Sequence, residues 1–585
     1  MVRYDWFAGD HGMNQRFRPL TCFLTLAMLA ALSSDATALA RYKQTRDSKK
    51  AHEATGARHP RNAGLKKRGH VVDDVAAPTR KSALAVDAAV EPPLSGDLAA
   101  VKNAIDLARR AKTSEATVIE KTIGDPAAQK LVEWYILRHP NADAKFGRFA
   151  AFIADNPSWP GLGLLRRRAE ARLWQERGDP TTVRRFTGDR PTSTKGRLAL
   201  ARALLVEGDR DGAERWVREV WRSEEMSERL ETEVLETFHD LLTREDHRAR
   251  MDKRIGAKDF SGANRVAQRL GSDELWIVKA CVAAMANETK ALDRLDAVEI
   301  VARQDLGYTL CRIHWLLRHD RMEEAARVTL AAAPATMALQ DTEEWWRERR
   351  SLARKLLDLG KFQTAYEVVR DAALPASQNY RADFHFMSGW IALRYLHDPA
   401  AARAHFAHID DGSANPTLLA RANYWRGRAA EAIGDNDAMR ASYEAAARHT
   451  TAYYGQLARA KLGLERLELR APPPADPASG PALSDEIVRA ADMLYAIGER
   501  DVVVRLAVDL AEQCDDVATL AALGELTSHR NDARAMLELG KTALARGLAV
   551  DHYACPTNGI PQHSFIGPEI ERSVIYSVAR VSLAG

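Results

Sequence analysis

Hydrophobic and polar positions in this chain follow the period of an α-helix through most of its length. After Asp97, apolar residues return at spacings of three and four, as in residues 128–137. This is the spacing that gathers them on one face of a helix. No convincing run of alternating, β-branched residues occurs up to Val550. The pattern therefore predicts an all-α protein.

A short turn recurs between the predicted helices, and a small or apolar residue follows five residues after each turn begins. The copies are Gly208-Asp209 with Ala213, Lys258-Asp259 with Ala263, Asp320-Arg321 with Ala325, Gly360-Lys361 with Ala365, His397-Asp398 with Ala402, and Gly434-Asp435 with Met439. The last four turns are spaced 40, 37 and 37 residues apart.

These turns predict a solenoid of helix pairs. Glycine or a polar residue ends the first helix in a backbone conformation that most side chains resist, and the small residue lets the next helix approach closely. One pair cannot bury its apolar face alone, so the pairs must stack. Coincidental periodicity among alanine-rich helices is the alternative interpretation.

Proline-containing stretches interrupt the helical pattern in the C-terminal part of the chain. The stretch 471–477 (Ala-Pro-Pro-Pro-Ala-Asp-Pro) cannot be helical through its middle. It separates the array from a smaller helical unit at 484–550, which contains the turn Gly498-Glu499. A loop at 555–561 and one more predicted helix at 568–580 follow.

The N-terminus has the pattern of a secretory signal peptide. Arg16 and Arg18 precede an apolar run from Leu20 to Leu32, and small residues end at Ala38-Leu39-Ala40. The run is short for a span of about 20 residues, although an uncleaved anchor is the alternative. Met13 is a second candidate start. Residues 41–97 are poor in aromatic residues and predict a disordered linker.

Composition narrows the class of protein. A chain of 585 residues is too long for one core, so several domains or an array are expected. The formal net charge of +4 gives no reason to expect nucleic acid as a partner. Charged residues make up 28% of the chain, and their dispersed mixture indicates solvated helix faces.

The five cysteines carry no CxxC pair, so the sequence signals neither a zinc site nor a redox dithiol. Cys22 lies in the predicted signal peptide and lacks the residues that precede a lipidated cysteine. The other four are too widely scattered for a disulfide framework to be expected.

Several stretches, taken in order over residues 120–580, resemble the soluble lytic murein transglycosylases of the alphaproteobacterial type. They are residues 152–160 (Phe-Ile-Ala-Asp-Asn-Pro-Ser-Trp-Pro) with 165–170, then 345–354, 424–429 and 451–458, and finally 560–580. Each motif alone is weak because helical repeats imitate one another. Their order along the chain carries the resemblance.

The resemblance implies a fold class and a domain plan. The expected fold is all-α: a right-handed superhelix of stacked helix pairs, a U-shaped solenoid similar to tetratricopeptide repeats. The expected domains are a signal peptide at 1–40, a disordered linker at 41–97, the superhelical domain at 98–470, a helical linker domain at 484–550, and the truncated start of a lysozyme-like catalytic domain at 551–585, of which only the first helix is present.

The resemblance also implies a reaction, cleavage of the β-1,4 bond between N-acetylmuramic acid and N-acetylglucosamine in peptidoglycan with a 1,6-anhydro product. One glutamate serves as the acid and then as the base, in the family pattern A-R-Q-E-S. Here the chain runs from Ala579-Arg580 to Val581-Ser582, so Ser582 stands at the position of the glutamate. A serine hydroxyl is too weak an acid to protonate a glycosidic oxygen. No catalytic residue is therefore assigned, and the substrate-binding residues are unknown.

Other residues do not replace this acid. Glu569 and Glu571 lie in the first turn of a predicted helix, where the helix dipole explains acidic residues. His314 and His385 are expected to be packed or satisfied structural residues, and no histidines have metal-ligand spacing. The aromatic residues Trp345, Trp346, Tyr424, Trp425, Tyr453 and Tyr454 are expected to pack between helices, with sugar stacking as the alternative.

The sequence thus predicts a periplasmic protein of the lytic transglycosylase family that is catalytically impaired. The alternative is a non-catalytic periplasmic scaffold or peptidoglycan-binding repeat protein. The expected partners are peptidoglycan glycan strands and other cell-wall proteins. Neither a cofactor, nor a metal, nor nucleic acid is expected, and no integral membrane segment is expected after signal cleavage.

Overall fold

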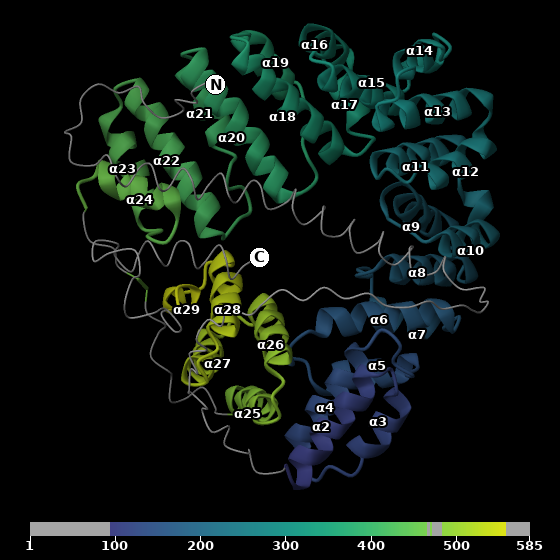
Figure 1. Ribbon diagram of the computed structural model, residues 1–585, viewed down its shortest axis with the longest axis vertical. Coiled ribbons are helices and arrows are strands. Elements are labelled where there is room, and N and C mark those ends of the chain that lie inside the picture. Colours follow the sequence, from purple (N-terminus) through teal and green to yellow (C-terminus); the bar gives the residue numbers. More distant parts are fainter. Residues whose placement is uncertain (1–93, 465–468, 471–481, 557–585) are drawn as a thin grey trace, which may run out of the picture. The chain divides into compact units, whose positions relative to one another are not determined.

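The computed structural model describes residues 94–464, 469–470 and 482–556, and all the regular structure in these ranges is helical (Figure 1). The prediction of an all-α fold is confirmed for these ranges. Each helix within them is too short or too polar to cross a bilayer. The predicted signal peptide, the proline-rich stretch 471–477 and the predicted helix 568–580 lie outside the described residues.

The helices follow one another with short connections, and most are between 8 and 18 residues long. The first group is α2 (Gly96–Arg109), α3 (Thr113–Glu120), α4 (Pro126–Arg138), α5 (Phe146–Asp155), α6 (Leu162–Gln175), α7 (Pro180–Thr187), α8 (Thr194–Val206) and α9 (Arg210–Ser223). The second is α10 (Glu228–Phe238), η2 (His239–Leu241), α11 (Arg244–Gly256), α12 (Phe260–Leu270), α13 (Ser272–Ala286), α14 (Ala291–Asp296), η3 (Ala302–Gln304), α15 (Leu306–Arg318), α16 (Met322–Ala331) and α17 (Pro334–Met337). The third is α18 (Thr342–Asp358), α19 (Phe362–Arg370), α20 (Gln378–Tyr395), α21 (Pro399–Phe406), α22 (Pro416–Ala432), α23 (Asn436–Ala447) and α24 (Tyr453–Lys461). The last is α25 (Ala482–Ala496), α26 (Arg500–Gln513), α27 (Val517–His529), α28 (Ala533–Ala545) and α29 (Asp551–Ala554).

The helices from α2 to α24 stack in chain order, as the colour sequence of Figure 1 shows. Their cores form in succession: one joins α6–α10, a second joins α11–α20, and a third joins α20–α24. Each core draws its residues from several consecutive helices. This is the packing expected of a solenoid, in which a helix pair buries its apolar face only against its neighbours.

The predicted turns are confirmed in their backbone geometry. The first residue of all six has a positive φ, including the non-glycine residues Lys258, Asp320 and His397 at 60°, 54° and 53°. The small residues that follow are fully buried, namely Ala213, Ala263, Ala325, Ala365 and Ala402, and Met439 is half-buried. Aspartate at the second turn position caps the next helix; for example, Asp209 accepts a 2.8 Å hydrogen bond from the Gly212 N–H. Each turn therefore ends one helix and starts the next.

Basic side chains join neighbouring helix pairs through backbone carbonyls at helix C-termini or, in the case of Ala142, in the loop that follows α4. These donors and acceptors are Arg172 to Ala142 (2.8 Å), Arg202 to Leu173 (3.0 Å), Arg250 to Trp221 (3.1 Å), Arg318 to Met285 (2.9 Å) and Lys355 to Leu317 (2.7 Å). The last carbonyls of a helix lack partners within it, and a guanidinium group offers five N–H donors. The interpretation of the charged residues as solvated faces was therefore incomplete, because many of them link one pair to the next.

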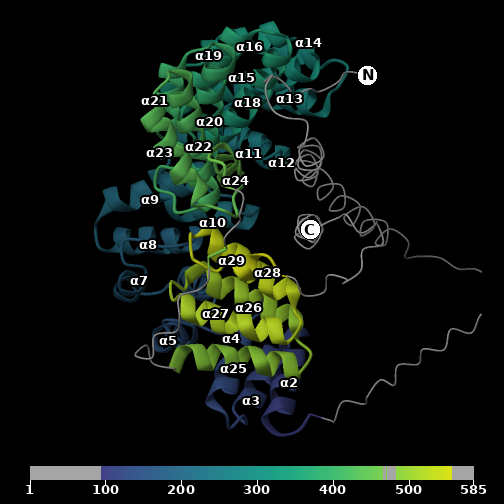
Figure 2. The ribbon, with the colours of Figure 1, turned by 90° about the vertical axis from the view of Figure 1, so that its left-hand side faces the viewer.

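The C-terminal helices α25–α28 share one hydrophobic core with α2–α6 (Figure 2). Ion pairs of 2.5 Å join Lys130 to Glu486 and Arg138 to Asp509 across this contact. Gln513 donates a 2.5 Å hydrogen bond to the carbonyl of Trp159, which is buried. The sequence stretch 152–160 thus forms part of this contact.

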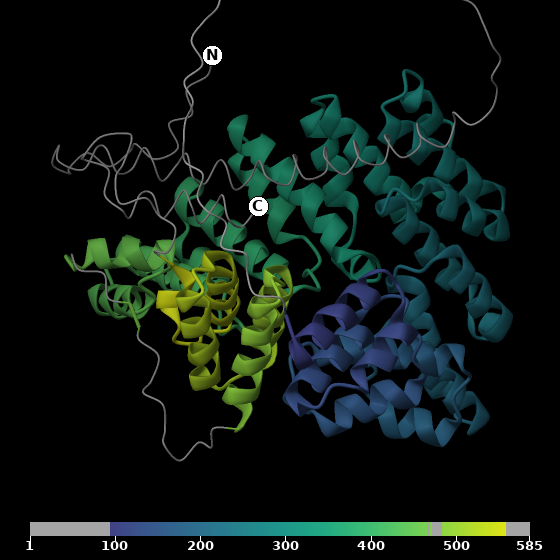
Figure 3. The same ribbon diagram turned by 60° about the horizontal axis from the view of Figure 1, so that its bottom comes forward.

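One of these C-terminal helices, α28, also contacts α22, and the group lies between the green and the purple helices in Figure 3. Gly547 has a φ of 87°, and a Cβ at this position would lie 2.8 Å from the carbonyl oxygen of Ala414. Arg470 donates to the carboxylate of Asp551 at 2.8 Å and to the carbonyl of Leu548 at 3.1 Å. The approach of Gly547 to Ala414 thus brings the C-terminal helices against the end of the array near α22, while Arg470 ties them to the segment that follows α24.

Candidate functional site

The stretch to which the resemblance assigns catalysis lies outside the described residues. It includes Ser582, Glu569 and Glu571. The absence of a catalytic glutamate therefore stays a prediction, and the candidate sites below come from the helical array.

The six aromatic residues of the matched motifs are packing residues, as expected. Trp345 and Trp346 are fully buried, and their indole N–H groups donate to Gln340 at 2.9 Å and to Asp383 at 3.0 Å. Tyr424 and Trp425 are also buried, while Tyr453 and Tyr454 are half-buried against each other, with ring centroids 5.1 Å apart. The buried tryptophans leave no ring face for a sugar.

His314 and His385, the two histidines named in the sequence analysis, differ in their hydrogen bonding. His314 is satisfied by Glu348 at 3.1 Å, as predicted. His385 is half-buried and packed, but its Nδ1 has no hydrogen-bond partner. Burial, together with the nearby His405 and His408 rings, lowers the pKa of His385 to about 4. Among the described residues, no three or more His, Cys, Asp or Glu side chains are arranged to hold a metal ion.

A disulfide corrects the expectation from the cysteine spacing. Cys281 in α13 and Cys311 in α15 are bonded, with their Cα atoms 5.3 Å apart, and both are fully buried. They are 30 residues apart in the chain. Because α14 and η3 connect α13 to α15 while these two helices lie side by side, residues that are scattered in the sequence meet. The spacing of the cysteines in the sequence indicated no disulfide framework, and it gave no sign of this bond.

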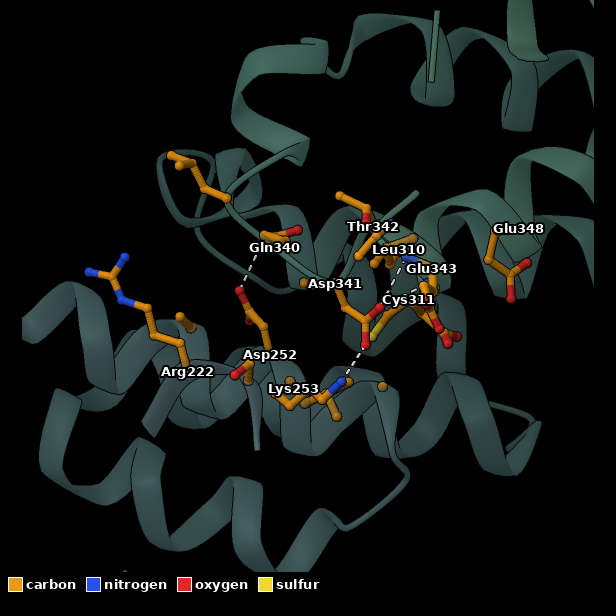
Figure 4. Close-up of a pocket in the computed structure, with 18 of the residues that line it drawn as sticks. Arg222, Asp252, Lys253, Leu310, Cys311, Gln340, Asp341, Thr342, Glu343 and Glu348 are labelled. Carbon is orange, nitrogen blue, oxygen red and sulfur yellow. Dashed lines mark hydrogen bonds and ion pairs between the residues drawn. The ribbon is translucent and has the colours of Figure 1, made fainter. Parts of the chain in front are cut away.

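A cavity of about 350 Å³ lies beside this disulfide, between α11, α15 and the segment that leads into α18 (Figure 4). Two contacts cross it between residues 88 positions apart: the Lys253 ammonium pairs with Asp341 at 2.6 Å, and the Gln340 amide donates to Asp252 at 2.7 Å. Burial works against the charged form of Asp341, yet Lys253 and the backbone N–H groups of α18 hold its pKa below the usual value. These contacts across the cavity thus join two segments of the array that are far apart in the sequence.

Two carboxyl groups meet at one glycine beside the cavity. Gly307 lies in α15, and a Cβ there would clash with Oδ1 of Asp252 and would lie 3.1 Å from Oδ1 of Asp305. The Oδ1 atom of Asp252 is buried and has no hydrogen-bond partner. Burial and the neighbouring Asp305 carboxyl raise the pKa of Asp252 well above its usual value, and burial also raises the pKa of Asp305. Asp252 is therefore held toward its protonated form.

We expect the Asp252→Asn variant to be more stable than the wild type at pH 8, by about 1–2 kcal/mol. A raised folded-state pKa means that the folded protein holds the proton more tightly. Wild-type stability therefore falls as pH rises from about 3.9, the unfolded value, toward the folded-state pKa. Asparagine keeps an oxygen for Gln340 and can donate toward Asp305. Urea unfolding between pH 4 and pH 8 measures the difference, and an equal pH slope in both proteins would contradict it.

Sequence analysis missed this carboxyl pair and the residues around it. Asp252 lies within α11 in an ordinary charged context, Met-Asp-Lys-Arg, and no spacing links it to Asp305. The available signal was Gly307, since a glycine inside a helix indicates a close approach by another group. It does not indicate which group approaches.

The cavity is built for joining helices rather than for acid–base catalysis. Its other carboxylates are engaged: Glu343 accepts from the Ser377 N–H at 3.2 Å, Glu344 pairs with Arg347, and Glu348 pairs with His314. The unpaired oxygen of Asp252 faces the backbone of Gly307. A general acid must reach the atom that it protonates. The three glutamates have partners, and the unpaired oxygen of Asp252 is directed at the protein's own backbone.

Comparison with known proteins identifies the fold. No protein-family model matches the chain, and no curated protein matches it. An inactive mutant of the lytic transglycosylase Slt from Pseudomonas aeruginosa is similar in structure, at 16% identity over 78% of this chain and 72% of that one, with a TM-score of 0.53. The 70-kDa soluble lytic transglycosylase Slt70 from Escherichia coli matches at 14% identity over 79% and 72% of the two chains, with a TM-score of 0.46. At these identities the first likeness shows a shared helical fold.

Proposed function

We propose that this chain is a cell-wall protein of the lytic transglycosylase type, whose helical array binds the glycan strands of peptidoglycan. The structural likeness to the Pseudomonas aeruginosa lytic transglycosylase, which extends over 78% of this chain, carries the proposal. The ordered sequence motifs support it, because stretches such as 152–160 and 345–354 take structural roles in the same array. Stacked helix pairs offer an extended surface suited to a linear polymer.

The proposed location is the periplasm. The N-terminal pattern of Arg16, Arg18 and the apolar run that follows is typical of export. The disulfide between Cys281 and Cys311 supports this location, because disulfides persist in oxidising compartments and are rare in the cytosol.

On this proposal, cleavage of the glycan strand by this protein is impaired. Lytic cleavage needs a group that protonates the leaving oxygen, and a carboxyl group with a raised pKa serves that purpose. Ser582 stands at the position that the resemblance assigns to this carboxyl group. A hydroxyl group cannot supply the proton at neutral pH. On this proposal the protein retains glycan binding without efficient bond cleavage.

A two-part experiment tests the proposal. The purified protein is expected to sediment with insoluble peptidoglycan sacculi at low salt, whereas an unrelated helical-repeat protein of similar charge is expected to stay in solution. It is also expected to release 1,6-anhydro muropeptides no faster than its Ser582→Ala variant. Failure to sediment would contradict glycan binding. Release faster than that of Ser582→Ala would contradict impairment.

A further inference from the structure

A second cavity lies between α7, α8 and α9, in the blue part of the array (Figure 1). Its volume is about 300 Å³, at the lower end of the range for ligand pockets. Three helices and their connections contribute its lining, which consists of Arg184, Asp189, Leu200, Leu204, Asp209, Arg215, Trp216 and Glu219. A cavity of this size suits one segment of a polymer rather than a large ligand.

The apolar part of the lining is formed by Leu200, Leu204 and Trp216. The two leucines from α8 are buried, with 1% and 4% of their surfaces exposed. Trp216 in α9 is half-buried: its ring packs against the core of α6–α10 and also lines the cavity. An indole in this position is fixed by the core while part of its surface remains available to a ligand.

Some of the charged groups in the lining are engaged in the array. Asp209 caps α9 through the Gly212 N–H at 2.8 Å, and Glu219 pairs with Arg197 at 3.4 Å. Arg184 lies 3.9 Å from Glu207. These groups have structural partners already, so they shape the cavity more than they offer free bonding capacity.

Three polar groups in the lining have no such partner. The Asp189 carboxylate, the Arg215 guanidinium and the Trp216 indole N–H form no hydrogen bond or ion pair with any other residue in the described part of the chain. Asp189 and Arg215 are exposed. They place one acceptor group and two kinds of donor around an aromatic surface.

We propose that this cavity is a saccharide subsite for β-1,4-linked N-acetylhexosamine units, with Trp216 as the stacking surface and Asp189 and Arg215 as hydrogen-bonding groups. The proposal rests on the proposed function, which supplies peptidoglycan as the polymer. A pyranose ring has an apolar face that suits an indole, and its hydroxyl and acetamido groups need both acceptors and donors at the edge.

The charges of the lining favour this ligand over a polyanion. Two arginines face three carboxylates, Asp189, Asp209 and Glu219, so the cavity is not a positively charged site of the kind that binds phosphate groups. The buried leucines and the indole equally disfavour a small, fully hydrated ion. A neutral polyhydroxyl ring with one apolar face matches the lining in shape and in bonding.

Fluorine NMR of the full chain labelled with 5-fluorotryptophan tests the subsite directly. The Trp216 resonance is assigned by its loss in the Trp216→Phe variant. Addition of chitotetraose, the β-1,4-linked tetramer of N-acetylglucosamine, is expected to shift this resonance and to leave that of Trp276 unchanged. Trp276 provides the matched control because it is 51% exposed on α13 and lines neither cavity. An unmoved Trp216 resonance at saturating sugar would overturn the proposal.

Variants measure the contribution of each group. Trp216→Ala is expected to raise the Kd for chitotetraose about tenfold, Asp189→Asn to raise it by a smaller factor, and Trp276→Ala to leave it unchanged. Equal melting temperatures of the wild type and Trp216→Phe show that the fold is intact, and Trp216→Phe is expected to retain part of the affinity. Equal affinity for cellotetraose, which lacks the acetamido groups, would overturn the assignment to N-acetylhexosamines.

Sedimentation with sacculi separates this inference from the proposed function. If the wild type sediments and chitotetraose leaves Trp216 unmoved, glycan binding stands and this subsite is wrong. If chitotetraose shifts Trp216 and the wild type does not sediment, the saccharide subsite stands and the peptidoglycan function is wrong.

Discussion

The Glu231→Gln variant is expected to lose roughly 3–5 kcal/mol of folding stability, because one carboxylate neutralises two buried guanidinium groups. Glu231 accepts hydrogen bonds from Arg250 at 2.9 Å and from Arg254 at 3.0 Å. Arg250 is fully buried, and Arg254 and Glu231 are nearly so, with 7% and 6% of their surfaces exposed. Glutamine keeps the shape of the side chain but removes its charge, so Arg250 loses its carboxylate partner and Arg254 keeps only Asp259, at 3.1 Å.

The position of this cluster enlarges the expected loss. Arg250 also donates to the carbonyl of Trp221 at 3.1 Å, and Arg254 donates to that of Met226 at 2.5 Å. These bonds hold α11 against the preceding helices. Loss of the central carboxylate therefore disturbs the arginines that join the helix pairs.

Urea unfolding followed by circular dichroism measures the effect, with Glu236→Gln as the control. Glu236 is on the same helix, α10, and is exposed. Burial alone would raise the pKa of Glu231, but the hydrogen bonds from Arg254 and Arg250 hold it below the usual value. Its contribution is thus present above the unfolded pKa of about 4.3 and is lost as pH falls through the folded-state pKa. A Glu231→Gln loss no larger than that of Glu236→Gln at pH 7 would refute the prediction.

The double variant Cys281→Ala/Cys311→Ala is expected to lose roughly 3–4 kcal/mol of stability. The bond closes a loop across 30 residues, and a cross-link of this length restricts the unfolded chain by about that amount. Both positions are fully buried, so alanine is chosen because it adds no polar atom. The connection between α13 and α15 also contains only short helices, which provide few other constraints.

Reductant provides the internal control for this variant. Treating the wild type with dithiothreitol under unfolding conditions is expected to lower its stability toward that of the double variant. The double variant itself is expected to be insensitive to reductant. The Cys514→Ala variant is expected to behave like the wild type, because Cys514 forms no disulfide. Equal stability of the oxidised wild type and the double variant would show that the cross-link has no stabilising role.

The repeat architecture could be predicted because its signals are local. A residue of positive φ and a small residue five positions later both act within one turn, as at Gly360 and Ala365. Their recurrence along the chain then predicts stacking without knowledge of any long-range contact. The six predicted turns were therefore placed correctly from the residues alone.

The cavities and the cross-link could not be predicted because they depend on distant positions. Cys281 meets Cys311 and Gln340 meets Asp252 only after the intervening helices have packed. A charged residue such as Arg250 looks the same in the sequence whether it faces water or lies buried beneath a neighbouring helix pair. The proposed saccharide subsite could not be predicted for the same reason, since it combines Trp216 and Asp189 from separate elements.

The basic side chains that bond to the preceding helix pair have a consequence for how the array opens. An interior pair is bonded on both sides, so its separation breaks two interfaces, whereas a terminal pair breaks only one. Unfolding is therefore expected to start at a free end of the array and to proceed from one helix pair to the next. The end at α2–α6 is not free, because α25–α28 complete its core. Helices α25–α28 therefore suppress unfolding that starts at α2–α6. As a result, a larger part of the array is expected to unfold in a single cooperative step.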